Sequence, residues 1–160
     1  MAVEPARADE VTFTAPYVVI EGVFAVRLDS PVTTPADVDR PGVRIGVKKG
    51  SAYDLYLTRT IEHATLVRGE DGVQAFLDEG LDVAAGIRQP MTAFVEAHPQ
   101  TRLVPERFMQ IQQAVGATKG RRPETVDWLS GVVEELKAGG FVAEALERSG
   151  RGDVTVAPPA

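Results

Sequence analysis

The stretch Arg44-Ile-Gly-Val-Lys-Lys-Gly-Ser-Ala-Tyr-Asp54 decides the fold of this chain, together with a later stretch, Glu79-Gly-Leu-Asp-Val-Ala-Ala85. The first is typical of a buried strand that turns at Gly50 into a helix capped by Ser51. The second is typical of a helix end, a tight turn and another buried strand. Together they predict a β-α-β-α-β unit whose first helix begins at a crevice. The amide groups of its first turn favour an anion there.

Length and composition limit the class of protein. The 160 residues suffice for one domain or two small lobes. The hydrophobic content of 44% and charged content of 25% are typical of a soluble globular chain. The net charge of −6 argues against a general nucleic-acid binder, and the absence of cysteine excludes disulfides and thiolate chemistry.

The amino terminus carries no targeting pattern. Residues 1–10 are polar and charged, without the apolar run of a signal peptide. No stretch approaches the ~20 apolar residues of a membrane-spanning helix. We therefore expect either a cytoplasmic protein or a chain that begins downstream of its export signal.

Strands and helices are expected to alternate along most of the chain. The predicted strands are residues 13–27, 43–47, 65–67, 81–85, 102–104 and 111–117. The predicted helices are a short one from Pro35 and residues 51–62, 71–78, 91–97, 123–138 and 141–148. This alternation predicts a mostly parallel α/β sheet.

The carboxyl-terminal part carries two further predictions. The inward face of the helix at 123–138 is expected to hold Val126, Leu129, Val133 and Leu136, with Trp128 nearby. The tail, residues 150–160, is expected to be loose.

The sequence offers little catalytic equipment. His63 and His98 lack partners at ligand spacing, so neither a metal nor another cofactor is expected. No Gly-x-Ser-x-Gly elbow and no phosphate-binding loop occur. Only Glu21, Glu106 and Asp54 are placed to be considered as acid or base. A binding protein is therefore favoured over an enzyme.

Several polar residues are candidate ligand contacts, each with a structural alternative. Arg7 precedes the first strand and Arg88 follows the strand at 81–85; either arginine grips a carboxylate or forms a surface salt bridge. Gln112 and Gln113 alternate in a strand and so point to opposite faces, one expected toward a crevice and the other toward solvent. Tyr17 and Trp128 are each either a core residue, which is the favoured interpretation, or a ligand platform.

The order of these pieces resembles the family 3 extracytoplasmic solute-binding proteins, the amino-acid receptors of ABC importers. The resemblance extends over roughly residues 2 to 148. It rests on Glu4-Pro-Ala-Arg7, Phe13-Thr-Ala-Pro-Tyr17, Ser30-Pro31, Pro35-Ala-Asp-Val38, Ile45-Gly-Val47 with Gly50-Ser51, Gly80-Leu-Asp-Val-Ala84 and Gly139-Gly140-Phe141.

The resemblance implies a periplasmic-binding-protein type II-like α/β fold of two lobes. Residues 1–29 and 109–160 would form a partial first lobe with the hinge strands, and residues 30–108 the second lobe. Family members are normally longer at the amino end, so this chain is expected to lack the start of its first lobe. Unpaired strand edges left there would invite self-association.

The family's ligand contacts carry over to some positions of this sequence. Arg7 matches the first-lobe arginine that binds an α-carboxylate, and Ser51 and Ala52 match the helix start that helps hold it. We add Tyr17, Tyr53 and Gln113 as expected contacts. The family's acidic residue for the α-amino group is replaced by Gly86-Ile87-Arg88. This change favours a more anionic ligand or a changed pose, with Arg88 as a second anion contact.

The function implied is solute binding in an interlobe cleft and delivery to a membrane permease, in a periplasmic or extracytoplasmic location. Binding by this chain alone is expected to be weak, about −4 kcal/mol or less favourable. A ligand-sensing or interaction module is the alternative, and a dehydratase-like enzyme on the same fold is a further one.

Overall fold

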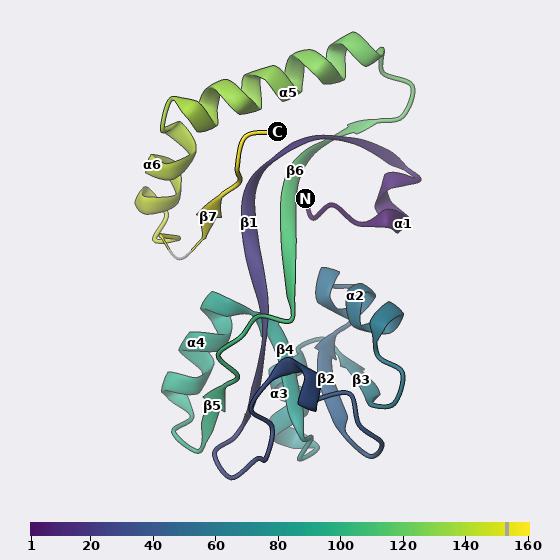
Figure 1. The fold of residues 1–160 in the computed structure, drawn as a ribbon, viewed down its shortest axis with the longest axis vertical. Coiled ribbons are helices and arrows are strands. Elements are labelled where there is room, and N and C mark those ends of the chain that lie inside the picture. The colour runs from purple at the N-terminus through teal and green to yellow at the C-terminus, as the bar shows by residue number, and fades with distance from the viewer. Residues whose placement is uncertain (153) are drawn as a thin grey trace. The chain divides into compact units, whose positions relative to one another are not determined.

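The computed structural model describes residues 1–152 and 154–160 (Figure 1). Its helices are α1 (Pro5–Ala8), the 3-10 helix η1 (Pro35–Asp37), α2 (Ala52–Thr60), α3 (Gly72–Asp78), α4 (Arg88–Ala97), α5 (Pro123–Ala138) and α6 (Phe141–Arg148). Its strands are β1 (Val11–Arg27), β2 (Arg44–Lys48), β3 (Thr65–Gly69), β4 (Val83–Ile87), β5 (Thr101–Leu103), β6 (Met109–Thr118) and β7 (Thr155–Val156).

The strands form a mixed sheet in the order β3-β2-β4-β1-β5, and β6 and β7 also pair with β1. β2 runs parallel to β3 and β4, whereas β1 runs antiparallel to β4, β5 and β7. The predicted α/β class is confirmed, but the sheet is mixed and not mostly parallel, because β1 runs antiparallel to β4 and β5. Parallel pairing is found in β3-β2-β4, where helices connect successive strands.

The chain divides into two compact units. The first comprises Met1–Ile20 and Ile111–Ala160, and the second comprises Glu21–Gln110. β1 and β6 each contribute residues to both units. The assignment of these units to the two lobes of a family stays a prediction. Among the described residues, no helix combines the length and the apolar character needed to cross a bilayer.

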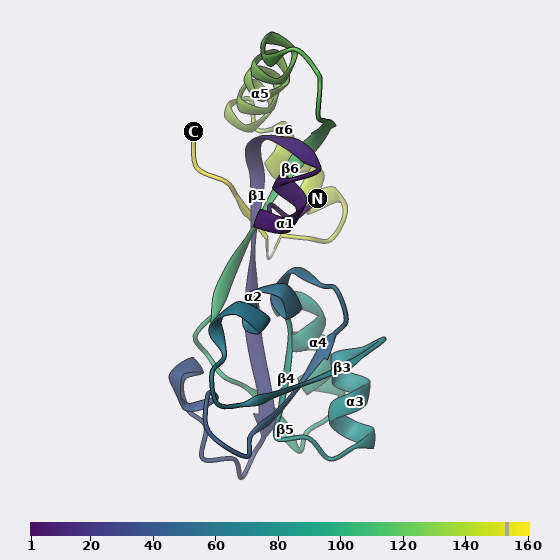
Figure 2. The same cartoon turned by 90° about the vertical axis from the view of Figure 1, so that its right-hand side faces the viewer.

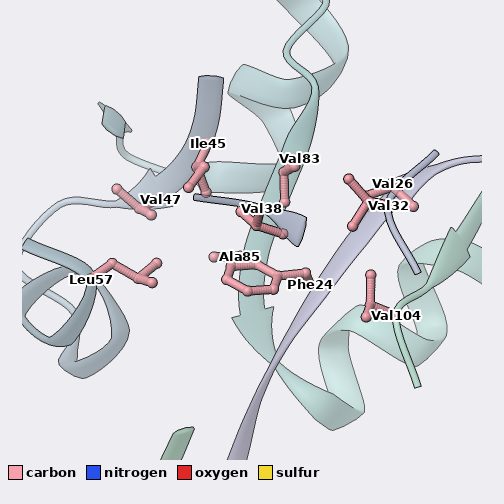
Figure 3. Packing of buried hydrophobic residues seen from close by; sticks show 10 residues of the cluster. All are labelled: Phe24, Val26, Val32, Val38, Ile45, Val47, Leu57, Val83, Ala85 and Val104. Carbon is pink, nitrogen blue, oxygen red and sulfur yellow. The ribbon is translucent and has the colours of Figure 1, made fainter. Parts of the chain in front are cut away.

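The second unit has an apolar core on each face of its sheet. Figure 3 shows one of them, a cluster whose members come from β1, β2, β4, α2 and the intervening loops: Phe24, Val26, Val32, Val38, Ile45, Val47, Leu57, Val83, Ala85 and Val104. The other lies against α3 and α4: Val23, Ala25, Phe76, Leu81, Ala84, Met91 and Phe94. Because side chains alternate along a strand, neighbouring residues of β1 and β4 serve opposite cores. Residues 22–26 of β1 and 83–86 of β4 are therefore buried on both faces, as their apolar runs indicate.

Two glycines bring α3 close to β2. A Cβ atom on Gly72 would lie 2.8 Å from the carbonyl oxygen of Gly46, and one on Gly46 would collide with the carbonyl oxygen of Gly72. Real side chains do not tolerate such distances, so only glycine fits at either position. This close approach fixes the start of α3 beside the middle of β2.

In the first unit, α5 and α6 have the predicted bounds, but two of the predicted core residues are exposed. Trp128 is 66% exposed and Leu136 is 39% exposed, whereas Val133 is buried. Each residue turns a helix by about 100°, which puts Trp128 on the side opposite Val126 and Val133. The expectation that Trp128 is a core residue is therefore wrong.

The tail is partly ordered, contrary to the prediction of a loose terminus. Thr155 and Val156 form β7 by pairing with Val19 and Val18. Lys137 secures the tail, since its Nζ donates to the carbonyl oxygen of Pro158 at 2.9 Å and to that of Pro16 at 3.1 Å. Within the predicted tail, residue 153 lies outside the described residues.

Candidate functional site

A cavity of about 350 Å³ lies in the second unit, where the parallel strands β2, β3 and β4 end. Figure 1 labels these strands and the helices α2, α3 and α4 that follow them, and Figure 2 shows β3, β4 and the three helices from a second direction. The cavity is lined by Lys48, Ser51, Tyr53, Glu70, Asp71, Val73, Ala85, Gly86, Ile87, Pro90 and Met91. The carboxyl ends of parallel strands are where ligands of open α/β sheets bind. Of the residues expected from sequence, Ser51 and Tyr53 line this cavity.

Ser51 is the N-cap of α2, as the sequence predicts. Its Oγ accepts a hydrogen bond from the backbone N–H of Asp54 at 3.1 Å. Gly50 before it has a φ of 73°, in the left-handed region that favours glycine. The predicted sequence of buried strand, glycine turn and capped helix is thus confirmed.

The carboxylate of Asp54 holds this turn in place. It is buried, and its Oδ2 accepts from the backbone N–H of Gly50 at 2.8 Å. Its Oδ1 accepts from Nε of Arg68 on β3 at 2.9 Å, and Nη2 of Arg68 donates to Oγ1 of Thr58 at 2.7 Å. The start of α2 is therefore tied to the neighbouring strand by charged hydrogen bonds.

Tyr53 and Ala52 occupy the first turn of α2 in different surroundings. Tyr53 is half-buried, and burial raises the pKa of its phenol, so the hydroxyl is neutral at pH 7. Ala52 is buried and does not line the cavity. In this arrangement Tyr53 offers a side chain, whereas Ala52 offers backbone alone.

Two carboxylates at the end of β3 also line the cavity, although the sequence analysis did not single them out. Asp71 caps α3, its Oδ1 accepting from the backbone N–H of Val73 at 3.0 Å. Glu70 directly follows Gly69, which is paired in register with Lys48 on β2. The predicted parallel sheet contained the signal, because neighbouring parallel strands end at one edge.

β4 and the start of α4 supply an apolar wall. A Cβ atom on Gly86 would lie 2.6 Å from Sδ of Met91, so glycine at this position lets the methionine pack against the strand. Ile87 and Pro90 continue the wall. At residues 86–88, where the resemblance places the family's acidic residue, the chain provides no carboxylate.

Arg88 does not line this cavity. Its Nε donates to Oε2 of Glu21 at 2.5 Å, and its Nη2 donates to the carbonyl oxygen of Pro105 at 3.2 Å. Arg107 also donates to Glu21, at 3.2 Å. Hydrogen bonds from Arg88 and then Arg107 lower the pKa of the Glu21 carboxyl. Glu21, Arg88 and Arg107, with Pro105 and Glu106, line a separate pocket.

The remaining predicted contacts belong to the first unit. Arg7 lies in α1 and donates from Nη1 to the carbonyl oxygen of Ala2 at 3.2 Å. Tyr17 is half-buried in β1, and Gln113 is half-buried in β6, where it bridges to Ala2. Their roles as ligand contacts stay predictions.

The histidines have local partners. Nδ1 of His98 lies 2.8 Å from the carbonyl oxygen of Phe94, and the backbone N–H of His63 donates to Asp39 at 2.8 Å. In residues 1–152 and 154–160, no three His, Asp or Glu side chains are grouped so as to hold a metal ion.

Sequence comparisons give no match, either to a protein-family model or to a curated protein. Comparison with solved structures, in contrast, finds similar proteins. A binding component of an ABC transporter from Wolinella succinogenes, complexed with lysine, has a TM-score of 0.76 and 22% identity. The solute receptor for L-cysteine of Neisseria gonorrhoeae has a TM-score of 0.75 and 20% identity. The ancestral amino-acid-binding protein AncCDT-1, a precursor of cyclohexadienyl dehydratase, has a TM-score of 0.72 and 19% identity.

These comparisons cover 92% of this chain in each case. The chain spans 66%, 61% and 64% of the respective structures, which is less than two thirds of their length. High structural similarity at such low sequence identity shows a shared fold and does not by itself show a shared function. The chain therefore has the mixed α/β, periplasmic-binding-protein type II fold of these binding proteins.

Proposed function

We propose that this chain binds a small polar solute, amino-acid-like or another carboxylate, for delivery to an ABC importer. The observation that carries the proposal is the cavity at the carboxyl ends of β2, β3 and β4, with the capped start of α2 at its edge. Two of the structurally similar proteins, the binding component complexed with lysine and the solute receptor for L-cysteine, support the same class of solute.

The start of α2 is suited to hold a carboxylate. The first N–H groups of a helix have no partner within the helix. The N–H of Asp54 is used by Oγ of Ser51. Those of Ala52 and Tyr53 are then the donors for a ligand carboxylate, aided by the helix dipole. The Ser51 and Tyr53 hydroxyls, which line the cavity, add neutral hydrogen-bonding groups.

Binding rather than turnover is supported by the positions of the candidate acid and base residues. Asp54 is committed to the turn at Gly50 and to Arg68, and Glu21 is paired with Arg88 and Arg107. Neither these two residues nor Glu106, the third candidate, is among the residues that line the cavity. A dehydratase-like activity has one point in its favour, the likeness to AncCDT-1, a precursor of cyclohexadienyl dehydratase.

The partner and the location follow from the same proposal. A binding protein of this kind presents its solute to a membrane permease, in the periplasm or another extracytoplasmic space. Arg7, Tyr17 and Gln113 remain candidate contacts from the first unit. The proposal does not depend on Arg88 as a second anion contact, because its guanidinium is paired with Glu21.

A thermal-shift screen against amino acids, dicarboxylates and polyamines tests the proposal. A ligand that binds the folded chain alone raises Tm in a concentration-dependent way. The Ser51→Gly variant is expected to lose most of this shift while keeping α2, because glycine at an N-cap costs only a few tenths of a kcal/mol. Ser149→Ala removes an exposed hydroxyl at the end of α6 and is the matched control. No stabilisation by any compound, or equal shifts in wild type and Ser51→Gly, would contradict the proposal.

A further inference from the structure

The charged side chains that line the cavity are unevenly balanced. One is positive, Lys48, and two are negative, Glu70 and Asp71. The nearby arginines do not redress this balance, because Arg68 is paired with Asp54 and Arg88 with Glu21. The cavity itself therefore presents more negative than positive charge to a ligand.

Glu70 is the carboxylate best able to meet a ligand. Across residues 1–152 and 154–160, no hydrogen bond or ion pair engages its side chain. Asp71 is already used as the cap of α3, where Oδ1 accepts from Val73. An exposed carboxylate without a protein partner is solvated by water and exchanges that water for a cationic group at little cost.

Lys48 stands next to Glu70 at the ends of adjacent strands. Lys48 is in register with Gly69, the residue before Glu70, and the N–H of Lys49 donates to the carbonyl oxygen of Gly69 at 2.9 Å. No ion pair joins Lys48 to Glu70 or Asp71 in the described part of the chain. The cavity thus offers a positive and a negative group, side by side, to a ligand that carries both signs of charge.

From this arrangement we infer that Glu70 is a specificity-determining residue, which makes the cavity prefer ligands with a cationic side chain over neutral or anionic ones. The inference rests on the proposed function and refines it. The ligand carboxylate is received at Lys48 and the start of α2, and the additional cationic group is received at Glu70. This reverses the preference for a more anionic ligand that the replacement at residues 86–88 favours.

The test uses three probes that share α-amino and α-carboxylate groups: lysine, norleucine and glutamate. Their affinities are measured by NMR titration, which suits weak binding, for wild type and Glu70→Gln. Lysine is expected to bind tightest and glutamate weakest. Because Glu70 is exposed, its removal should weaken lysine binding by roughly threefold to fivefold. Norleucine should change by less than about twofold, and glutamate should bind more tightly.

Glu96→Gln is the control, since Glu96 is an exposed carboxylate on α4 that does not line the cavity. It should leave all three affinities unchanged. Equal weakening of the three probes in Glu70→Gln would make Glu70 a contact of the shared α-ammonium and overturn its role in specificity. Preferential binding of glutamate would also overturn it, with the proposed function intact. Binding of none of the probes, and of no compound in the thermal-shift screen, would overturn both.

Discussion

Asp54 and Arg68 form a buried-to-surface ion pair, in which Oδ1 of Asp54 accepts from Nε of Arg68 at 2.9 Å. Asp54 is only 3% exposed, and its other oxygen accepts from the N–H of Gly50. One carboxylate thus connects β3, the glycine turn and the first turn of α2. The geometry of the cavity edge at Ser51 depends on this connection.

Replacing Asp54 should therefore destabilise the second unit. Asp54→Asn keeps the shape but loses the charge, and we expect the free energy of unfolding to fall by about 2 kcal/mol. Urea denaturation measures this. Asp78→Asn, which alters an exposed carboxylate at the end of α3, should change it by less than about 0.5 kcal/mol. Similar effects of the two substitutions would show that the hydrogen bonds of Asp54 add no more to the free energy of unfolding than an exposed carboxylate does.

A second prediction concerns the close contact between β2 and α3. Gly46→Ala places a methyl group against the backbone of Gly72, which cannot yield as a flexible side chain can. The free energy of unfolding should fall by about 1–3 kcal/mol or more. Gly131 on α5 has open space around its Cα, and Gly131→Ala should raise it by about 0.5–1 kcal/mol. If Gly46→Ala were as well tolerated as Gly131→Ala, this result would contradict the close approach of the β2 and α3 backbones.

Asp37 provides a pH-dependent contribution to stability. Its Oδ2 accepts from the backbone N–H and the hydroxyl of both Thr33 and Thr34, at 2.9–3.1 Å, and these bonds lower its pKa well below the usual 3.8. A carboxyl whose pKa is lowered in the folded state contributes stability that is fully present when the pH is above its unfolded-state pKa. This contribution is lost as the pH falls through the folded-state pKa. The difference in Tm between wild type and Asp37→Asn should therefore be constant above about pH 5 and shrink below pH 4. A difference that stays constant down to pH 2 would contradict the hydrogen bonding at Asp37.

Trp128 is the single tryptophan of the chain, so its fluorescence reports one site. With 66% of its surface exposed, it should emit as a solvated indole and be quenched by acrylamide nearly as well as in the unfolded chain. Protected, blue-shifted emission would mean that this face of α5 is covered in solution.

The order of elements was predictable because it depends on local chemistry. Ser51 caps α2, Asp71 caps α3, and Pro123 opens α5, and each signal lies within a few residues of its effect. Contacts between distant segments were not predictable in this way. The pairing of Arg88 with Glu21 joins residues 67 positions apart, and β7 forms because the tail reaches Val18.

The cavity lining shows the same division. Ser51 and Tyr53 follow from the strand-to-helix turn, whereas Glu70 resembles any other charged residue before a helix until the register of β2 and β3 is known. The exposed position of Trp128 follows from the 100° turn per helical residue, but the usual burial of large aromatic residues favoured the opposite prediction. Sequence patterns thus predict where elements lie, and pairing between elements decides which side chains share a cavity.

The most direct test of the account is an NMR titration of the ¹⁵N-labelled chain with lysine, following every backbone amide. If the cavity is the binding site, the shifts should concentrate at residues 48–53, 70–73 and 85–91, and saturate with a Kd in the range of about 1 mM or weaker. The same titration of Ser51→Gly should weaken binding without changing the spectrum of the rest of the unit. Saturable shifts confined to other segments, or no shifts in these three, would contradict a solute-binding site at the ends of β2, β3 and β4.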